Sequence, residues 1–345
     1  MNIGIIEKII KELTEKIKVG EDQKIELANS TTIPLDEKNF HEIKDTGSDR
    51  EIAFIDGGNA EIVAAPNFSV HFIRVYYTVY KNNKRVKNKK FEFYTFSYSY
   101  KKEGKIRYKT EIFPINFELN KEDLDFDSED KTLATRFHAF PISRIGEIAR
   151  RFAELRVASE LINELNEGDV ILLDGNLQGY ITNENEYLEN LYEKGAHKNV
   201  LITAVSKTTR LFTNTGNSIN AALEEISPNY EWHYHPIAKL ENNNYKADIS
   251  FVKLNINSKY IFKFEVYNRQ KFNDELLSIL KQNSKDPVFS GYPYGLIEAD
   301  RFARVSSKEK EYLQTLFIAK AKRAWSKISR CLSATDAHDI LDKIN

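Results

Sequence analysis

The chain has 345 residues, which is enough to bury a sizeable hydrophobic core in one large domain or two ordinary ones. Its 41% hydrophobic and 29% charged residues are typical of soluble globular proteins. No apolar run reaches the roughly 18 residues of a membrane span, and charged residues interrupt the N-terminus where a signal peptide would be apolar. The single cysteine, Cys331, excludes an internal disulfide, so we expect a cytoplasmic protein without a membrane span.

The formal net charge is only −1, but basic residues are concentrated in two stretches. Residues 81–109 hold eleven Lys or Arg and two acids, and residues 301–330 hold nine and two. Because aromatic residues are interleaved with these bases, we predict a polyanion such as nucleic acid as the partner. The alternative is a solvated hairpin edge on which lysines prevent aggregation. The residues predicted to bind nucleic acid are Lys84, Arg85, Lys87, Lys89, Lys90, Lys101, Lys102, Arg301, Arg304 and Trp325.

The first 49 residues are predicted to be an addition to the main domain. Apolar residues recur at helical spacing within residues 2–19, which predicts an amphipathic helix. Such a helix usually packs on its own domain, but it is also our candidate for a partner-binding surface. Residues 21–49 are polar and irregular, and we interpret them as a linker.

Two short apolar runs in the chain end in the same Asp-Gly pair. Residues 51–59 read E-I-A-F-I-D-G-G-N, and residues 169–177 read D-V-I-L-L-D-G-N-L. Each run is too short for a helix and lacks alternation, so each predicts a strand buried on both faces that ends at Asp56 or Asp174. The glycines after Asp56 favour a sharp turn and a close approach by another group. An ordinary Asp-Gly turn explains one copy, but two carboxylates at the ends of two buried strands form a candidate metal site.

Between these two runs, the pattern predicts three strands and a helix. The three strands are dense in β-branched and aromatic residues and separated by turn signals, which is typical of an antiparallel meander over residues 69–81, 90–101 and 105–115. The helix is predicted over residues 142–165, with Gly168 just beyond its end.

The predicted helix carries a carboxylate on its apolar stripe. Glu154 shares a face with Ala158, Leu161 and Leu165, and a carboxylate in such a position is costly unless it is paired or ligates a metal. Glu147 shares that face one heptad earlier. An ion pair with Arg150 or Arg151 is the alternative role for either carboxylate.

After Asp174 the pattern predicts further alternation of helices and strands. A helix over residues 185–194 precedes a strand over 200–205 that leads into Lys207. Later strands are predicted at residues 231–238, 247–254 and 260–266, followed by helices from residue 290 onward. His233 and His235 share one face of their strand, but two histidines without a third ligand favour half-buried histidines over a zinc site.

This order of elements matches an RNase H-like α/β fold, a mixed sheet flanked by helices, in which acids from separate positions converge. Hard oxygen ligands favour Mg²⁺ or Mn²⁺. Two such ions, about 4 Å apart, activate a water and stabilise the leaving oxygen of a phosphodiester. No Walker A motif, GxSxG elbow, CxxC pair or HExxH motif is present, so the rival chemistries lack their parts.

Five short motifs resemble the NurA nuclease family over about residues 50–305, within a nuclease domain that we place at residues 50–330. They are Ile55-Asp56-Gly57-Gly58, the helix of Glu154, Leu172-Leu173-Asp174-Gly175-Asn176-Leu177, Ser206-Lys207-Thr208, and Gly291-Tyr292-Pro293 followed by Leu296-Ile297-Glu298-Ala299. The resemblance implies an RNase H-like fold and a Mn²⁺-dependent nuclease that acts on DNA ends and single strands. It also implies a homodimer that works with the hexameric HerA translocase in DNA end resection. Residues 331–345 are interpreted as a C-terminal tail helix.

The resemblance also assigns roles to individual residues. By position, Asp56, Glu154 and Asp174 would be the metal-binding acids, and Tyr292 and the residue eight positions later would complete the site. The family usually has a histidine at that last position, whereas this chain has Asp300. An aspartate can bind a metal through oxygen, but it cannot act as a cationic acid near neutral pH.

The expected mechanism follows from these roles. Asp56 and Asp174 would bridge two divalent ions, Glu154 would hold one of them, and Asp300 would hold or orient the other. Water attacks the phosphorus in line, and Lys207 helps to stabilise the transition state.

Two other functions stay open. Actin-like ATPases and sugar kinases share this sheet and also place Asp-Gly at a strand end, but they need a late Gly-rich adenosine loop, and only Gly291 and Gly295 follow Gly216. A DNA-end clamp or translocase adaptor with a decayed site is the second alternative, because Asp300 departs from the family pattern. Among nucleases, both a host resection enzyme and a component of an anti-phage system fit the sequence.

Overall fold

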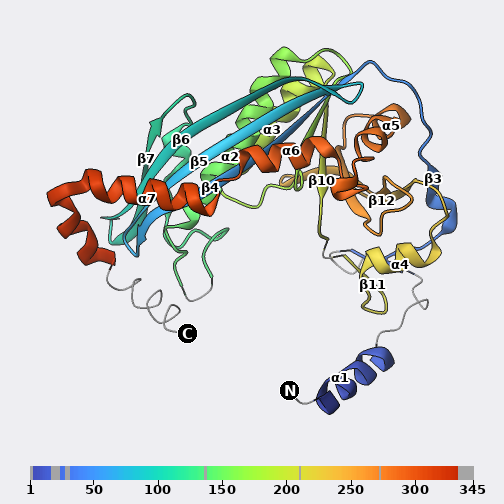
Figure 1. Ribbon diagram of the computed structural model, residues 1–345, viewed down its shortest axis with the longest axis horizontal. Helices are drawn as coiled ribbons and strands as arrows, with labels where there is room; N and C mark the ends of the chain where they lie inside the picture. The colour runs from blue at the N-terminus through green and yellow to red at the C-terminus, as the bar shows by residue number, and fades with distance from the viewer. Residues whose placement is uncertain are drawn as a thin grey trace.

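The structure is a computed structural model that describes residues 3–16, 24–27, 32–135, 138–209, 211–271 and 273–332. At its centre lies an 11-stranded mixed sheet (Figure 1). In spatial order its strands are β3 (Phe40–Glu42), β12 (Trp232–Asn242), β13 (Tyr245–Lys253), β14 (Phe262–Tyr267), β10 (Leu201–Ser206), β9 (Val170–Asp174), β4 (Glu51–Ala65), β5 (Phe68–Lys81), β6 (Lys84–Lys102), β7 (Lys105–Pro114) and β8 (Phe126–Asp127). β9 runs parallel to β4 and β10, and the other neighbouring pairs of this sheet are antiparallel.

Helices cover both faces of the sheet (Figure 1). One face carries α2 (Arg144–Leu161) and α3 (Glu184–Lys198), and the other carries α5 (Asp274–Asn283), α6 (Tyr294–Ala303) and α7 (Ser307–Ala321). Along β4, Ala53 and Ile55 pack against the α2 side, whereas Ile52 and Phe54 pack against the α5 and α6 side. The strand is therefore buried on both faces, as predicted from its unbroken apolar run.

The prediction that the first apolar strand ends at Asp56 is wrong. β4 continues through Gly57 and Gly58 to Ala65, because β5 pairs with it along this whole length. The pairing of β4 with its neighbours nevertheless changes at Asp56. The parallel pairing of β4 with β9 stops after Ile55, so β4 goes on with a partner on one side only.

The predicted linker also contains ordered strands. β3 extends the main sheet by pairing with β12, and β1 (Lys24–Glu26) pairs with β2 (Thr32–Pro34) and β11 (Phe212–Thr213) in a small second sheet. Each of these strands is two or three residues long. So short a strand shows no hydrophobic period, which is why the sequence pattern indicated an irregular segment.

The remaining predictions agree with the structure at the level of elements. The antiparallel meander is β5 to β7, and the helix of Glu154 is α2. The sequence pattern did not predict α4 (Ile219–Ile226) or α5, both of which begin after a capping side chain. Within the described chain, no helix is both long enough and apolar enough to cross a membrane.

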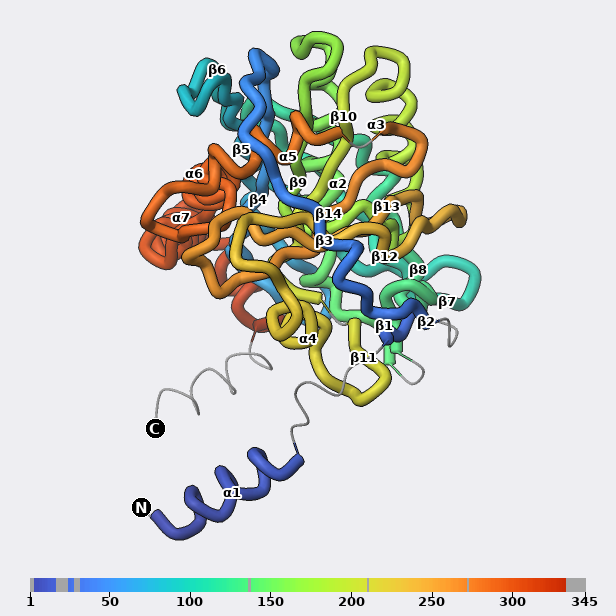
Figure 2. The backbone as a smooth tube through the Cα atoms, turned by 90° about the vertical axis from the view of Figure 1, so that its right-hand side faces the viewer, coloured from blue at the N-terminus to red at the C-terminus, as the bar shows by residue number. Residues whose placement is uncertain are grey.

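The predicted N-terminal amphipathic helix is present as α1 (Ile3–Lys16), and residues 17–19 of the prediction lie outside the described residues. None of its residues is buried, and both views show it apart from the sheet (Figures 1 and 2). At the other end, residues 325–332 are helical, and residues 333–345 of the predicted tail helix lie outside the described residues.

Candidate active site

The candidate site lies where β4 and β9 diverge. Ile55 and Leu173 are the last paired residues of these parallel strands, and β9 ends one residue later at Asp174. The register therefore places Asp56 and Asp174 next to each other at the point where the sheet opens. The two aspartates predicted from the repeated Asp-Gly pattern come together, although only Asp174 ends its strand.

Two glycines after Asp56 let helices approach β4 from opposite faces. A Cβ atom on Gly57 would lie 2.4 Å from Oε1 of Glu154 and 2.8 Å from Cγ of Arg150, both on α2. A Cβ atom on Gly58 would lie 2.3 Å from the carbonyl oxygen of Ala303, at the end of α6. The glycines thus provide the predicted close approach, but within a continuous strand and not in a turn.

Asp56 is at the centre of a crowded acidic group. Burial, followed by the charges of Glu154 and Asp174, raises the pKa of Asp56 to about 8, although the Gly57 N–H and Arg150 oppose the shift. Oδ1 of Asp56 accepts the hydrogen bond from the Gly57 N–H at 2.7 Å. Since like charges that share a site disfavour ionisation, the three carboxylates would be stabilised by a divalent cation.

Two basic side chains neutralise part of this charge. Nζ of Lys207 lies 2.6 Å from Oδ2 of Asp174, and Nη1 of Arg150 pairs with Oε1 of Glu154. In the described ranges, no three acidic, histidine or cysteine side chains form a ready-made cation cage. The donor set is nevertheless all oxygen and net acidic, which is the chemistry that Mg²⁺ and Mn²⁺ prefer.

The segment before α6 adds an aromatic wall. Tyr292 is 1% exposed, and burial together with the nearby Asp174 and Asp56 charges raises the pKa of its hydroxyl. Nζ of Lys207 lies 5.1 Å from the centre of the Tyr292 ring. Asp300 lies at the rim, partly exposed, and its Oδ2 is 2.5 Å from the Arg304 guanidinium.

The structure distinguishes the two glutamates that the sequence left open. Glu154 is buried beside Asp56, whereas Glu147 is exposed. The ion-pair alternative also holds for Glu154, since Arg150 binds it. Arg151 instead pairs with Glu184, at the start of α3.

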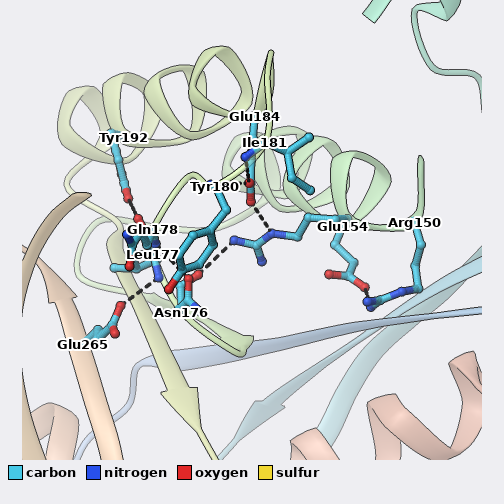
Figure 3. A network of polar contacts seen from close by, with 11 residues as sticks. Arg150, Glu154, Asn176, Leu177, Gln178, Tyr180, Ile181, Glu184, Tyr192 and Glu265 are labelled. Atoms are coloured by element: carbon cyan, nitrogen blue, oxygen red, sulfur yellow. Dashed lines mark hydrogen bonds and ion pairs between the residues drawn. The ribbon is translucent and has the colours of Figure 1, made fainter. Parts of the chain in front are cut away.

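A network of buried polar groups holds the loop after Asp174 (Figure 3). The Leu177 N–H donates to Glu265 at 2.7 Å, and the Tyr192 hydroxyl donates to the Leu177 carbonyl at 2.9 Å. Arg151 bridges Glu184 at 2.8 Å and the Asn176 carbonyl at 2.9 Å. The sequence pattern named Arg151, Asn176 and Leu177 for other reasons, but it did not indicate Glu184, Tyr192 or Glu265, because strand alternation and helix capping explain their types equally well.

The residues predicted to bind nucleic acid fall into separate groups. Four of them are engaged in ion pairs, in the couples Arg85–Glu298, Lys87–Glu164, Lys90–Glu92 and Arg304–Asp300. The exposed ones without an ion pair to a described residue are Lys84, Lys89, Lys101, Lys102 and Arg301. Trp325 is half-buried against Val63 and Ala65.

The exposed lysines of β6 lie at its two ends. Lys90 is opposite Tyr76, which is opposite Asp56, so Lys90 and the neighbouring Lys89 are level with the site. Lys84 lies about 20 Å away along the strand in one direction. Lys101 lies eleven residues from Lys90 in the other direction. At about 3.3 Å per residue this places Lys101 and Lys102 about 35 Å away along the strand.

Known proteins resemble this chain over most of its length. The NurA domain model matches residues 50–305, which is most of the chain. The chain belongs to the NurA family. The crystal structure of the NurA nuclease from Sulfolobus solfataricus is similar, with 14% identity, a TM-score of 0.51, and coverage of 93% of this chain and 94% of that chain. This similarity confirms the predicted RNase H-like mixed α/β fold.

Endonuclease V structures are also among the similar folds. The Ciona intestinalis protein, in complex with an inosine-containing 24mer DNA, has 14% identity and a TM-score of 0.38, covering 74% of this chain and 84% of that chain. The catalytic domain of human endonuclease V has 9% identity and a TM-score of 0.36, covering 74% and 80%. No curated protein sequence matches the chain.

Proposed function

We propose that this NurA-family chain is a deoxyribonuclease that depends on Mn²⁺ or Mg²⁺, with two ions at the fork between β4 and β9. The observation that carries the proposal is the convergence of Asp56, Glu154 and Asp174, three acids from three elements, at the fork where the pairing of β4 with β9 stops. Burying three like charges is unfavourable without a cation, so such a cluster is better explained by chemistry than by stability.

The chain's own side chains have distinct roles in this proposal. Asp56, Glu154 and Asp174 would hold the ions, and Asp300 would supply a fourth carboxylate after separating from Arg304. When bound, the ions would activate a water and stabilise the leaving oxygen. Lys207 lies beside Asp174 and can place its positive charge on the reacting phosphate.

Tyr292 would act as a neutral donor. Its raised pKa keeps the hydroxyl protonated at neutral pH, and its ring packs under the Lys207 ammonium. Donation of this hydrogen to a phosphate oxygen would orient the DNA backbone.

The DNA substrate would include ends and single strands. The exposed Lys84, Lys89 and Arg301 are suited to bind backbone phosphates, and Arg85, Lys87, Lys90 and Arg304 could exchange their ion pairs for phosphates. Lys101, Lys102 and Trp325 would contact DNA further from the site, with Trp325 available for stacking.

A hexameric HerA-type translocase and a second copy of this chain are the proposed protein partners, in DNA end resection or anti-phage defence in the cytoplasm. α1 supports the choice of a docking surface, because Ile3, Ile6, Ile10 and Leu13 are each about half exposed or more. Deletion of residues 1–16 should abolish co-purification with the translocase and leave the circular dichroism spectrum of the remaining chain native-like.

The nuclease proposal is tested by incubating the chain with single-stranded and blunt double-stranded DNA in Mn²⁺, Mg²⁺ or EDTA. Asp56→Ala and Asp174→Ala proteins are compared with Glu160→Ala, which changes an exposed acid on α2. We expect cation-dependent cleavage that both aspartate variants lose and the control keeps. If the native chain is inactive, the assay is repeated with the translocase and ATP, and continued inactivity supports the decayed adaptor. Cleavage that survives both aspartate substitutions refutes the site.

A further inference from the structure

Two consecutive arginines of α2 lie on either side of the site and are used in different ways. Arg151 is 14% exposed, and it donates from Nε to Glu184 and from Nη2 to the Asn176 carbonyl. Both contacts are with protein groups that hold the loop after Asp174 (Figure 3). Arg151 therefore has a structural role.

Arg150 reaches into the acidic group itself. Its Nη1 pairs with Glu154 and lies 3.4 Å from the carbonyl oxygen of Gly57, and its Cγ packs where Gly57 has no side chain. Its charge also acts on Asp56. Arg150 therefore lies against β4 at Gly57, next to Asp56 and the reacting centre of the proposed nuclease.

Within the described residues, only one nitrogen of the Arg150 guanidinium donates a hydrogen bond. Nε and Nη2 donate to no atom of the described residues, and the side chain is 31% exposed. A guanidinium carries five N–H donors in a planar fork that matches two oxygens of a phosphate. The free part of the fork can therefore bind an anion that enters from solvent.

A positively charged side chain beside the three carboxylates would help the site to bind a negatively charged phosphodiester. Three carboxylates repel a phosphodiester, and the phosphate gains further negative charge on its oxygens as the transition state forms. A guanidinium stays charged at any working pH and binds phosphate with two parallel hydrogen bonds. Lys207 supplies one positive charge on the Asp174 side, and Arg150 is its counterpart on the Glu154 side.

We propose that Arg150 is a further catalytic residue, which binds a non-bridging oxygen of the scissile phosphate and stabilises the transition state. The inference rests on the proposed nuclease function. The competing interpretation is that Arg150 only neutralises Glu154 until a cation binds. The two interpretations predict different effects of removing Arg150. A side chain that only neutralises Glu154 competes with the divalent cation for that carboxylate, whereas a catalytic residue acts on the phosphate after the cation has bound.

The experiment compares Arg150→Gln and Arg150→Lys with Arg156→Gln. Arg156 forms an i,i+4 pair with Glu160 on the same helix, in the spacing of Arg150 and Glu154, but on the exposed face. Three quantities are measured, which are kcat and KM for single-stranded DNA, Mn²⁺ affinity from the electron spin resonance signal of free Mn²⁺, and DNA affinity with Ca²⁺ in place of Mn²⁺.

We expect Arg150→Gln to lower kcat about 100-fold, the scale of losing one preorganised transition-state donor. Mn²⁺ affinity should stay native or become tighter, and DNA affinity in Ca²⁺ should fall about tenfold. Arg150→Lys should recover part of the loss, because it keeps the charge but not the two-point contact. Arg156→Gln should match the native protein in all three measurements.

Two results would overturn the proposal. Native kcat with tighter Mn²⁺ binding in Arg150→Gln would show a counter-ion only, and joint loss of Mn²⁺ binding and kcat would show that Arg150 positions Glu154. If Arg150→Gln does not fold, Arg150→Lys decides, since native kcat in that variant excludes a two-point contact. If the native chain cleaves no DNA even with the translocase and ATP, the nuclease function fails separately. Equal DNA affinity of the native and Arg150→Gln proteins in Ca²⁺ refutes Arg150 as a phosphate ligand in either case.

Discussion

Asp56 and Asp174 meet at one fork of the sheet, but the protein surrounds them differently. On the Asp56 side, Gly57 removes a side chain so that Glu154 and Arg150 can crowd against the strand. Burial, together with repulsion from the Glu154 and Asp174 carboxylates, raises the pKa of Asp56 there to about 8. On the Asp174 side, the following loop is tied to Glu265, Tyr192 and Arg151 by hydrogen bonds of 2.7 to 2.9 Å.

The difference shows how the fold tolerates an unfavourable cluster of charges. The Asp174 loop is held by satisfied buried groups, which fix its geometry whether or not a cation is present. The Asp56 side keeps its repulsion, which a divalent cation would relieve. In the proposed nuclease, the Asp174 side therefore contributes stability and the Asp56 side contributes reactivity.

The largest effect is expected from Glu265→Ala, which removes hydrogen bonds that hold the loop on the Asp174 side. Glu265 is fully buried, pairs with Lys263 at 2.5 Å, and accepts from the Tyr245 hydroxyl and the Leu177 N–H. Its removal leaves the half-buried Lys263 ammonium without this carboxylate and the buried Tyr245 hydroxyl and Leu177 N–H without their acceptor, so the free energy of unfolding should fall by about 3–5 kcal/mol. Urea denaturation measures this, with Glu160→Ala as the exposed control. A loss below about 1 kcal/mol would show that the network is not what holds the loop.

Gly57→Ala should damage catalysis more than stability. The added methyl group would meet Oε1 of Glu154 at 2.4 Å and force that carboxylate away from Asp56. Misplacement of about 1 Å can reduce the rate about 100-fold. The measurement is kcat for Mn²⁺-dependent cleavage by a variant whose thermal melt is still cooperative, and native kcat would refute the close-approach role of Gly57.

Gly175→Ala is the matched change on the other side and should have the opposite outcome. Gly175 has a φ of 117°, and a Cβ atom there would meet no atom within 4 Å. The cost is backbone strain, so stability should fall by about 1–3 kcal/mol while kcat of the folded protein changes less than tenfold. A kcat loss as large as that of Gly57→Ala would remove the distinction between the two sides.

The pH dependence of stability reports the burial of Asp56 and its repulsion by the neighbouring carboxylates. In EDTA, the folded state keeps the Asp56 proton up to about pH 8, whereas the unfolded chain loses it near its ordinary value of 3.8. The folded state therefore binds more protons between these values, and its stability should fall as pH rises from about 4 to 8. Asp56→Asn should flatten this slope in urea denaturation at pH 5 and 8. An unchanged slope would place the titration elsewhere.

The smallest effect concerns the two ends of β6. Replacing Lys84 and Lys89 by alanine should reduce the slope of log affinity against log salt for single-stranded DNA by about 1.4, because each phosphate contact contributes about 0.7. Replacing Lys101 and Lys102 should change it less, since they lie about 35 Å along the strand from the site. Fluorescence anisotropy over a salt series measures both, and equal effects would mean that DNA follows the whole strand.

The sequence by itself determined the elements that are long enough to show a pattern. Apolar runs ending in Asp-Gly identified β4 and β9 with Asp56 and Asp174, and helical spacing placed Glu154 on the buried stripe of α2. These features are local, because burial on both faces requires an unbroken apolar run and a helix repeats every 3.6 residues. Order along the chain then sufficed to indicate the family.

Only the tertiary structure decided how these parts meet. It showed that β4 passes through Asp56 because β5 pairs with it throughout, and that Gly57 makes room for a helix. It also brought Glu265, 88 residues away from Leu177, to the loop after Asp174. Long-range pairing and close packing depend on which surfaces meet in space, and the local pattern of a single strand or helix does not specify its partner.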